Sequence, residues 1–356
     1  MKRRAGLLRD KLHMKAIDGL LVTKPENRKY LSGFSGTAGS LVVTREQLFL
    51  LTDFRYIEQA RQECRQWQVI EIKTSTFDLI KTCLQDWKIS RLGYEEDFLT
   101  HKQFLELSEK IPDGVLVPAA GMVEDLRMIK GQDEITQIID SARLADEAFT
   151  HILNYLKPGC TEIEISLEME YFMRKGGAKK SSFDIIVASG VRGAMPHGVA
   201  SNKQLQAGDL VTMDFGCEFN DYCSDITRTV CLGAPTEMQE RIYQTVLEAH
   251  DAGVNSIRQG VKASDVDQAT RSIIEKYHFG ENFRHSTGHG VGLIVHENPV
   301  ISAKDGTILQ AGMVITVEPG IYLPGWGGVR IEDMVLVEEK GARLLTNAPR
   351  DHLMAL

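Results

Sequence analysis

Features that mark several common protein classes are absent from this sequence or scarce in it. Six cysteines are scattered along the 356 residues, and no two of them form a CxxC pair. Such sparse cysteines are typical of reduced thiols in a cytoplasmic protein, and this is the location we expect. The first third of the chain contains neither a GxGxxG nor a GxxxxGK[ST] pattern, so nothing there indicates a phosphate-binding loop.

Positive charge and long apolar segments are equally scarce. The formal net charge of −8 argues against a general nucleic-acid-binding protein, which would need a basic face. No run approaches the roughly 18 apolar residues that a membrane-spanning helix needs. The basic N-terminal stretch MKRRAGLLRDKLHMK is interrupted by charges before the apolar core of a signal peptide develops. We therefore expect neither nucleic acid nor membrane as a partner.

The length of the chain and the pattern of its first third predict two domains. A chain of 356 residues is too long for one ordinary core. Short apolar runs alternate with helical patterns over residues 1–122, which predicts an α/β domain with a mixed sheet. Asp53 and Arg55 are better explained there as an ion pair at a strand end than as functional residues. The expected strands cover 19–23, 40–44, 47–53, 69–73 and 91–94, and the expected helices cover 54–65, 77–87 and 101–110.

Residues 131–356 predict a second, α+β domain, in which a helix pair and a strand pair occur twice. Capping residues are expected at Thr161, Thr236 and Ser264, the first two within capping boxes. An architecture duplicated in this way commonly places a site between its two halves. The expected helices cover 132–156, 161–175, 236–258 and 264–277. The expected strands cover 183–189, a hairpin over 209–231, 313–318 and 329–337, with loops at 285–292 and 319–328.

The hairpin over 209–231 carries an aspartate on each arm. Its arms are rich in Val, Thr, Phe and Tyr, and Asn220-Asp221 is a turn signal. This turn would bring Asp214 and Asp225 roughly opposite each other, within a residue or two of register. Two carboxylates in an apolar strand pair repel each other unless a proton or a cation lies between them. The alternative is that one aspartate ends a strand and the other is solvated.

A second pair of carboxylates and a histidine extend the pattern. If the glycine-rich loop over 319–328 closes symmetrically, Glu318 lies across from Glu332. His289 lies in a Gly-His-Gly segment, where small neighbours allow close approach of the backbone to a bound ion. Four carboxylates and one imidazole form a reasonable ligand set for two divalent ions, and this oxygen-rich set suits Mn²⁺ better than a thiolate-rich zinc site. Such ions would offset the negative charge and activate a water molecule.

Further polar residues border these strands. Neutral imidazoles at His197, His285 and His296 could polarise a carbonyl or shuttle a proton, although any one of them alone could be incidental. Arg330 precedes Glu332 by two residues and could orient a metal-binding carboxylate or bind the negative end of a substrate.

Five segments of the chain resemble the pita-bread metallopeptidases, a family that includes methionine aminopeptidase, aminopeptidase P, prolidase and creatinase. In family order, these segments are IVASGVRGAMPHG, MDFGCEFNDYCSDITRT, HSTGHGVGLIVHENP, ITVEPGIY and GVRIED. The first third, through NRKYLSGFSGTAG and TDFRY, resembles the N-terminal domain of the prolidase and creatinase branch. The resemblance implies a C-terminal pita-bread domain preceded by a smaller α/β creatinase-like domain.

The resemblance also assigns roles to residues and partners to the chain. It implies that Asp225 and Glu332 bridge two ions, and that His197, His285, His296 and Arg330 serve substrate binding and proton transfer. It implies a homodimer, two Mn²⁺ ions with Co²⁺ or Zn²⁺ as alternatives, and small peptides with proline at the second position as substrates. The complete ligand set carried over from the family is Asp214, Asp225, His289, Glu318 and Glu332.

The leading hypothesis for the function is hydrolysis of the peptide bond before proline by a prolidase-like Xaa-Pro dipeptidase. The alternative is aminopeptidase P, which releases the first residue of longer peptides. The sequence does not separate the two activities, because they differ in whether the substrate pocket closes beyond proline. A creatinase-like amidinohydrolase and a non-catalytic binding protein are weaker alternatives, since those relatives lose the metal ligands that this chain contains.

Overall fold

The structure is a computed structural model that describes residues 2–356. The chain divides into two compact units, Met1–Arg127 and Met128–Leu356. No helix within residues 2–356 combines the length and the apolar character needed to cross a bilayer. The six cysteines are all free thiols.

The N-terminal unit is built on a six-stranded mixed sheet in the order β4-β3-β2-β1-β5-β6. Strand β1 pairs antiparallel with β2 and parallel with β5, which confirms the mixed sheet that the sequence predicts. Arg55 donates two hydrogen bonds to the Asp53 carboxylate, so the predicted ion pair is confirmed. The strands are β1 (Gly19–Val22), β2 (Ser40–Thr44), β3 (Leu48–Thr52), β4 (Gln68–Glu71), β5 (Leu92–Tyr94) and β6 (Leu116–Pro118). The helices are α1 (Lys2–Met14), α2 (Pro25–Ser32), α3 (Ile57–Glu63), α4 (Thr76–Cys83), α5 (His101–Lys110) and α6 (Glu124–Met128), which reaches the boundary between the units.

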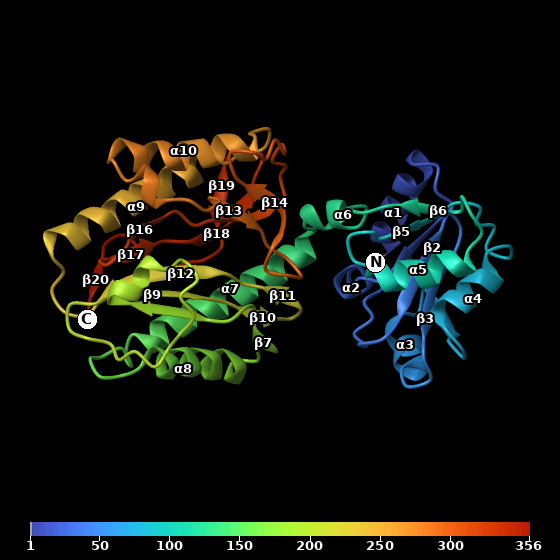
Figure 1. Ribbon diagram of the computed structural model, residues 1–356, viewed down its shortest axis with the longest axis horizontal. Helices are drawn as coiled ribbons and strands as arrows, with labels where there is room; N and C mark the ends of the chain where they lie inside the picture. The colour runs from blue at the N-terminus through green and yellow to red at the C-terminus, as the bar shows by residue number, and fades with distance from the viewer. Residues whose placement is uncertain (1) are drawn as a thin grey trace. The chain divides into compact units, whose positions relative to one another are not determined.

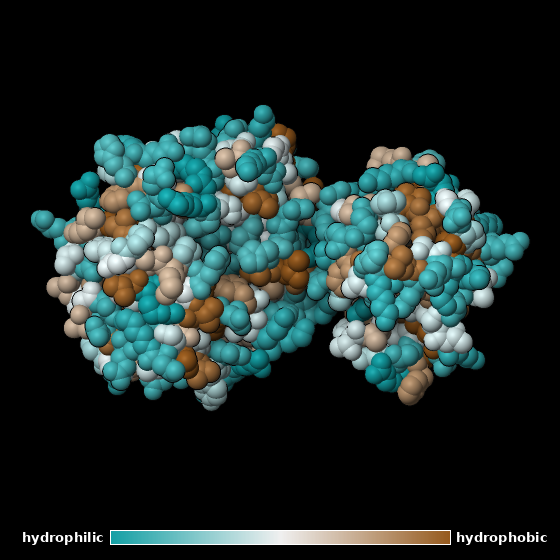
Figure 2. All heavy atoms as spheres, viewed as in Figure 1, coloured by the Kyte–Doolittle hydropathy of each residue, from teal (hydrophilic) through white to brown (hydrophobic). Residues whose placement is uncertain are grey.

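The C-terminal unit has its strands between two pairs of helices (Figure 1). One pair is α7 (Gln132–Ile152) and α8 (Glu162–Lys175), and the other is α9 (Glu237–Ser256) and α10 (Ala263–Lys276). The apolar faces of α7 and α8 pack on the strands that carry Val187, Val211 and Met213. On the face in view, hydrophilic side chains cover most of this unit, and the apolar ones lie in scattered patches (Figure 2).

Two sheets of the C-terminal unit carry the predicted site. The first has the order β20-β12-β9-β8 and the second β14-β13-β15-β18-β19. Smaller sheets join β11-β10-β7 and β16-β17. The strands are β7 (Lys180–Ser181), β8 (Ile186–Ser189), β9 (Leu210–Phe215), β10 (Cys217–Phe219), β11 (Tyr222–Cys223), β12 (Ile226–Cys231), β13 (Gly288–Gly290), β14 (Glu297–Ile301), β15 (Val314–Val317), β16 (Gly320–Leu323), β17 (Gly327–Arg330), β18 (Asp333–Val337), β19 (Ala342–Leu344) and β20 (Met354–Ala355), with short 3-10 helices η1 (Gly190–Ala194) and η2 (Gly280–Asn282).

The duplication predicted from the sequence appears in the backbone. Before α8, Thr161 forms an isolated bridge with Gln204, and before α10, Lys262 forms the corresponding bridge with Ile308. The capping boxes predicted at Thr161 and Thr236 are both present. Helix α10 differs, because it begins at Ala263 with Lys262 as its N-cap and no side-chain cap. The predicted cap at Ser264 is therefore wrong.

Two segments predicted as loops contain strands. Residues 319–328 include all of β16 and the start of β17, which pair antiparallel from Gly320 opposite Arg330 to Leu323 opposite Gly327. Residues 285–292 contain β13. Both predictions are wrong because turn residues mask the strands: β13 consists of Gly-His-Gly, and β16 lies between Pro319 and Pro324.

Candidate metal centre

The first hairpin places its two aspartates near each other. On β9, Asp214 lies opposite Thr227 of β12, and Asp225 lies two residues before Thr227. The hairpin bends at Gly216, where an added Cβ would meet the Ser224 carbonyl oxygen at 1.8 Å. This bend turns the chain just before Asp225. The predicted register, within a residue or two, is confirmed.

The second pair of acids comes from the neighbouring sheet. Strand β15 runs antiparallel to β18 with Val317 opposite Asp333, so the next pair in this register is Glu318 and Glu332. The backbone of Glu332 also forms an isolated bridge with Thr227. The two sheets therefore meet where Glu332 approaches the first hairpin.

His289 enters from β13, with a glycine on either side. An added Cβ at Gly288 would meet the Thr316 carbonyl oxygen at 2.0 Å, and one at Gly290 would meet the Asn298 carbonyl oxygen at 2.3 Å. The glycines therefore allow neighbouring backbone segments to come close, whereas the sequence suggested that they make room for a bound ion. The Nδ1 atom of His289 lies 3.1 Å from the Gly290 carbonyl oxygen, which favours a proton on Nδ1 and a free lone pair on Nε2.

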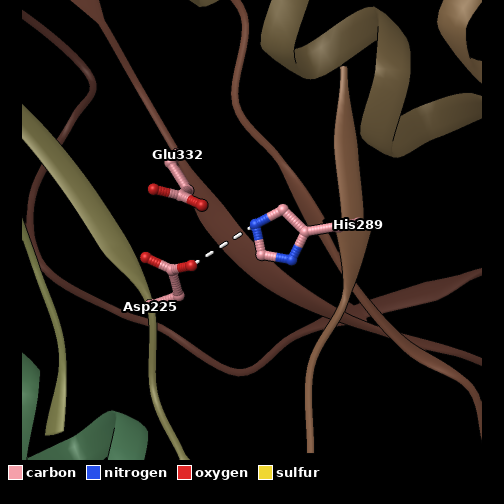
Figure 3. A group of neighbouring side chains, drawn as sticks. All are labelled: Asp225, His289 and Glu332. Atoms are coloured by element: carbon pink, nitrogen blue, oxygen red, sulfur yellow. Dashed lines mark ion pairs between the residues drawn. The ribbon is translucent and has the colours of Figure 1, made fainter. Parts of the chain in front are cut away.

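Three of these side chains form a group that could hold a metal ion. One ligand atom each from Asp225, His289 and Glu332 lies within 4.8 Å of the other two, and all three side chains point toward one another (Figure 3). The His289 Nε2 atom lies 3.5 Å from Asp225 Oδ2 and 3.4 Å from Glu318 Oε1. Glu318 thus borders the same group.

The electrostatics of this group show strong repulsion in the absence of a cation. Burial, together with the charge of Glu332, raises the pKa of Asp225 well above its usual range. Burial and the charge of Glu318 do the same to the pKa of Glu332. Burial raises the pKa of Glu318 to about 8, and it lowers the pKa of His289 to about 4. Ionised carboxylates and a neutral imidazole are the forms that bind metal, and a bound cation would stabilise the carboxylate charge.

The remaining acid, Asp214, is held by Arg330. The Arg330 Nη2 atom donates to Asp214 Oδ2 at 2.5 Å, which agrees with the orienting role suggested from the sequence. The other oxygen, Oδ1, is buried and has no hydrogen-bond partner. An unpaired carboxylate oxygen inside a protein destabilises the folded state. The charge of Asp214 also helps to raise the pKa values of Asp225 and Glu318. The residues present therefore fit a divalent cation, because their carboxylate oxygens are the ligands that such an ion binds.

The three loop histidines lie near the acids but in different settings. His285 is half-buried, and burial with the charge of Arg330 lowers its pKa to about 4. His296 is more exposed, and its ring centre lies 4.3 Å from that of His289. His197 is exposed, and its charge helps to lower the pKa of both His285 and His296. The structure thus brings all three histidines to one site.

Tyr322 is a polar residue of this site that the sequence did not single out. Its hydroxyl lies 2.9 Å from His285 Nε2 and accepts a hydrogen bond from Arg330 Nη1 at 2.9 Å. Gly320 makes room for this hydroxyl, since an added Cβ there would approach it to 2.4 Å. Side chains alternate between the two faces of a strand, so Gly320 and Tyr322 share one face of β16. This alternation could have indicated Tyr322 from the sequence, but residues 319–328 were predicted as a loop.

Two threonines also support the acids and were not predicted. Thr227 Oγ1 donates to Glu332 Oε2 at 2.7 Å. Thr316 Oγ1 accepts a hydrogen bond from the His289 backbone N–H at 3.1 Å and lies 3.4 Å from Glu318 Oε1. These contacts hold the side chains of Glu332 and Glu318 and the backbone of His289. Threonine is common in strands, so nothing in the sequence distinguished these two threonines from others.

Comparison with known proteins identifies the family that matches this geometry. A model of metallopeptidase family M24 matches residues 136–339, and a model of the creatinase/prolidase N-terminal domain matches residues 4–129. The chain belongs to metallopeptidase family M24. The predicted fold class, a pita-bread domain preceded by a creatinase-like domain, is confirmed.

Relatives of this M24 protein match it over its whole length. It is 40% identical to the Xaa-Pro dipeptidase of Pyrococcus furiosus, with 99% of this chain and 100% of that protein covered. Among solved structures, the Xaa-Pro dipeptidase from Bacillus anthracis has a TM-score of 0.97 at 44% identity, covering 100% of this chain and 99% of that one. The X-Pro aminopeptidase from Thermotoga maritima has a TM-score of 0.89 at 37% identity, covering 96% and 98%. The M24 chain is therefore a metallopeptidase, and membership of the family implies the use of a divalent metal.

Proposed function

We propose that this chain is a prolidase-like dipeptidase that uses two divalent ions to hydrolyse the peptide bond before proline in Xaa-Pro dipeptides. The observation that carries the proposal is the buried group of Asp225, His289 and Glu332, bordered by Glu318, in a chain similar over its whole length to Xaa-Pro dipeptidases. A cluster of acids with such raised pKa values is a liability for folding unless the site binds cations.

The proposed ligands divide between the two halves of the C-terminal unit. We propose that Asp225 and Glu332 would help to hold the ions from the centre of the group and that Asp214 would contribute its free oxygen. The unpaired Asp214 Oδ1 supports this assignment, because it is the buried oxygen that Arg330 leaves free. Oxygen ligands and one imidazole suit Mn²⁺, with Co²⁺ and Zn²⁺ as alternatives. The proposed ligand set is Asp214, Asp225, His289, Glu318 and Glu332.

Metal bound at such a site polarises a scissile carbonyl and activates water for attack. The protein contributes the orientation of the ligands. Thr227 holds one oxygen of Glu332, and Arg330 holds one oxygen of Asp214, so the opposite oxygens stay directed at the centre. The Gly290 carbonyl keeps the proton of His289 on Nδ1, away from the acids.

The histidines and Arg330 are proposed to handle the substrate. With its pKa lowered to about 4, His285 is neutral at pH 7 and linked to Arg330 through the Tyr322 hydroxyl. A neutral imidazole can accept or donate a hydrogen bond to a substrate carbonyl or amide. We propose that His197 and His285 position the peptide, while His296 stabilises the oxyanion of the tetrahedral intermediate.

A second candidate is aminopeptidase P activity on longer peptides. It is favoured by the similarity to the X-Pro aminopeptidase from Thermotoga maritima, which covers nearly the whole chain. We rank the dipeptidase first because the chain is 40–44% identical over its whole length to Xaa-Pro dipeptidases and 37% identical to this aminopeptidase. A homodimeric state and a cytoplasmic location are part of the proposal and rest on the family resemblance and the reduced cysteines.

A substrate panel tests the proposal. The purified chain is stripped of metal with a chelator, reloaded with Mn²⁺, and assayed on an Xaa-Pro dipeptide, an Xaa-Pro-Xaa tripeptide and a proline-free dipeptide. We expect hydrolysis of the first substrate, weak hydrolysis of the second, and none before metal is restored. Faster cleavage of the tripeptide would favour the aminopeptidase, whereas equal cleavage of the proline-free dipeptide, or full activity without metal, would overturn the proposal.

A further inference from the structure

The loop that carries His197 is fixed at both of its ends. It leaves β8 at Ser189, and it is paired again where Val199 forms an isolated bridge with Ile186 and the Ser201 carbonyl accepts from the Ile163 N–H. Between these points, His197 itself is exposed, and within residues 2–356 no hydrogen bond holds its ring. The position of this imidazole therefore depends on what holds the loop backbone.

A single buried carboxylate holds both ends of the loop. Glu162 is the first residue of α8, and it is fully buried. Its Oε1 atom accepts from the backbone N–H and the hydroxyl of Ser189, each at 2.8 Å. Its Oε2 atom accepts from the N–H of Ser201 at 3.1 Å and from its hydroxyl at 2.7 Å. One side chain thus joins two serines that stand on either side of His197.

The middle of the loop is tied to the same carboxylate. Arg192 donates from Nη1 to Glu162 Oε2, and its Nη2 donates to the Val199 carbonyl at 2.8 Å. Charge-assisted hydrogen bonds of this kind are stronger than neutral ones. Glu162 therefore reaches Val199, two residues after His197, through Arg192, and these contacts together restrict the movement of the loop.

The loop so held lies directly against the proposed metal centre. Arg330 donates from Nη1 to the Pro196 carbonyl at 3.0 Å, and Pro196 precedes His197. The loop backbone also packs closely on β17, since an added Cβ at Gly193 would meet the Gly328 nitrogen at 3.0 Å. Arg330 is also held by Thr227, Tyr322 and Asp214, so a displacement of the loop would chiefly change the place of His197.

We propose that Glu162 is a positioning residue for His197, through a clamp formed by Glu162, Ser189, Arg192 and Ser201. This inference rests on the proposed function, in which His197 contacts the substrate. A role confined to helix stability is a poor explanation of these contacts, because the first turn of α8 is already capped by Thr161 and Glu164. The corresponding residue of α10 is Ala263, so a helix at this place in the fold forms without such a carboxylate.

A double-mutant cycle tests the proposal on the full-length, Mn²⁺-loaded chain. Activity on an Xaa-Pro dipeptide is compared among the wild type, Glu162→Gln, His197→Ala and the double variant. Glu168→Gln is the matched control, because Glu168 lies on the same helix and pairs with His151. We expect Glu162→Gln to lower kcat/KM by roughly 100-fold, the cost of a misplaced group in an active site. The same substitution should have almost no further effect in the His197→Ala background, and Glu168→Gln should be neutral.

Hydrogen exchange of the metal-free protein supplies a readout that does not depend on activity. Glu162→Gln should raise exchange of amides in 189–201 and leave 283–287 unchanged. If Glu162→Gln does not fold, the Ser189→Ala/Ser201→Ala variant replaces it, with an expected loss of about fivefold that also vanishes in the His197→Ala background.

The possible outcomes separate this inference from the proposed function. A wild type that cleaves no Xaa-Pro peptide overturns the proposed function, and the inference with it. A wild type that does cleave, with Glu162→Gln near wild-type activity, or with an effect that multiplies with that of His197→Ala, overturns the clamp alone. Unchanged exchange over 189–201 would also contradict it.

Discussion

The two halves of the C-terminal unit hold their histidine loops with opposite chemistry. In the first half, Glu162 of α8 accepts hydrogen bonds from the loop that carries His197. In the second half, Arg271 of α10 donates to the segment that carries His285, with Asp267 behind it. The same arrangement of helix and strand thus uses an anion as the anchor on one side and a cation on the other.

The second anchor has its own internal support. Arg271 donates to the Phe283 carbonyl at 2.9 Å and to the His285 carbonyl at 2.5 Å, and its guanidinium lies 4.4 Å from the centre of the Phe283 ring. The buried carboxylate of Asp267 accepts from Arg271 and from the Thr287 hydroxyl. The two halves therefore share an arrangement of helices and strands but differ in these polar contacts, so we expect that each half can be perturbed by itself.

Glu332→Gln should have the largest effect, because this residue belongs to the centre that both halves share. The amide retains the shape of the side chain but loses the charge, so we expect Xaa-Pro hydrolysis to fall to background and metal content, measured by elemental analysis, to fall with it. The substitution also removes one of the mutually repelling buried acids. The metal-free variant should therefore unfold at the same temperature as the metal-free wild type, or at a higher one.

The matched control for this prediction is Glu338→Gln. Glu338 lies just after β18, is exposed and pairs with Arg343. Its loss should be neutral, since exposed ion pairs contribute little. Normal hydrolysis by Glu332→Gln, with a full complement of metal, would contradict the assignment of Glu332 as a metal ligand.

Arg271→Lys should have an intermediate effect confined to the second half. Lysine keeps a positive charge for Asp267, but it lacks the fork that reaches two carbonyls. We expect kcat/KM to fall by about tenfold, on the order of 1.4 kcal/mol, and hydrogen exchange to rise over 283–287 but not over 189–201. Glu162→Gln should give the reverse pattern, and a rise in both segments from either variant would show that the two loops are not held independently.

Much of the centre could be predicted from sequence because its signals are local. Apolar strands that carry isolated acids, a turn at Asn220-Asp221 and two capping boxes are each contained in a few residues. The register of Asp214 and Asp225 followed from the turn, and that of Glu318 and Glu332 from the loop between them. Each of these predictions needed only the pairing of neighbouring strands.

What could not be predicted depends on contacts between distant segments. Glu162 was not singled out from the sequence, since its partners Ser189 and Ser201 lie in another segment of the chain. The predicted cap at Ser264 is wrong because a backbone carbonyl replaces the side-chain cap. The Ala263 N–H, one of the amides at the start of α10, donates its hydrogen bond to the Thr307 carbonyl. Tyr322 was hidden because its strand is flanked by glycine and proline.

The smallest effect should come from the caps that begin α8 and α10, the corresponding helices of the two halves. Thr161 accepts from the Glu164 N–H, whereas Lys262, at the same place before α10, makes no side-chain cap. We expect Thr161→Ala to lower the free energy of unfolding by about 1 kcal/mol and Lys262→Ala to change it by less than about 0.5 kcal/mol, as measured by urea denaturation of the metal-free protein. Both variants should keep wild-type kcat/KM, because neither side chain touches the histidine loops. Equal losses from the two substitutions would mean that the exposed Lys262 side chain stabilises α10 in another way, and the contrast between the halves would then be limited to their loops.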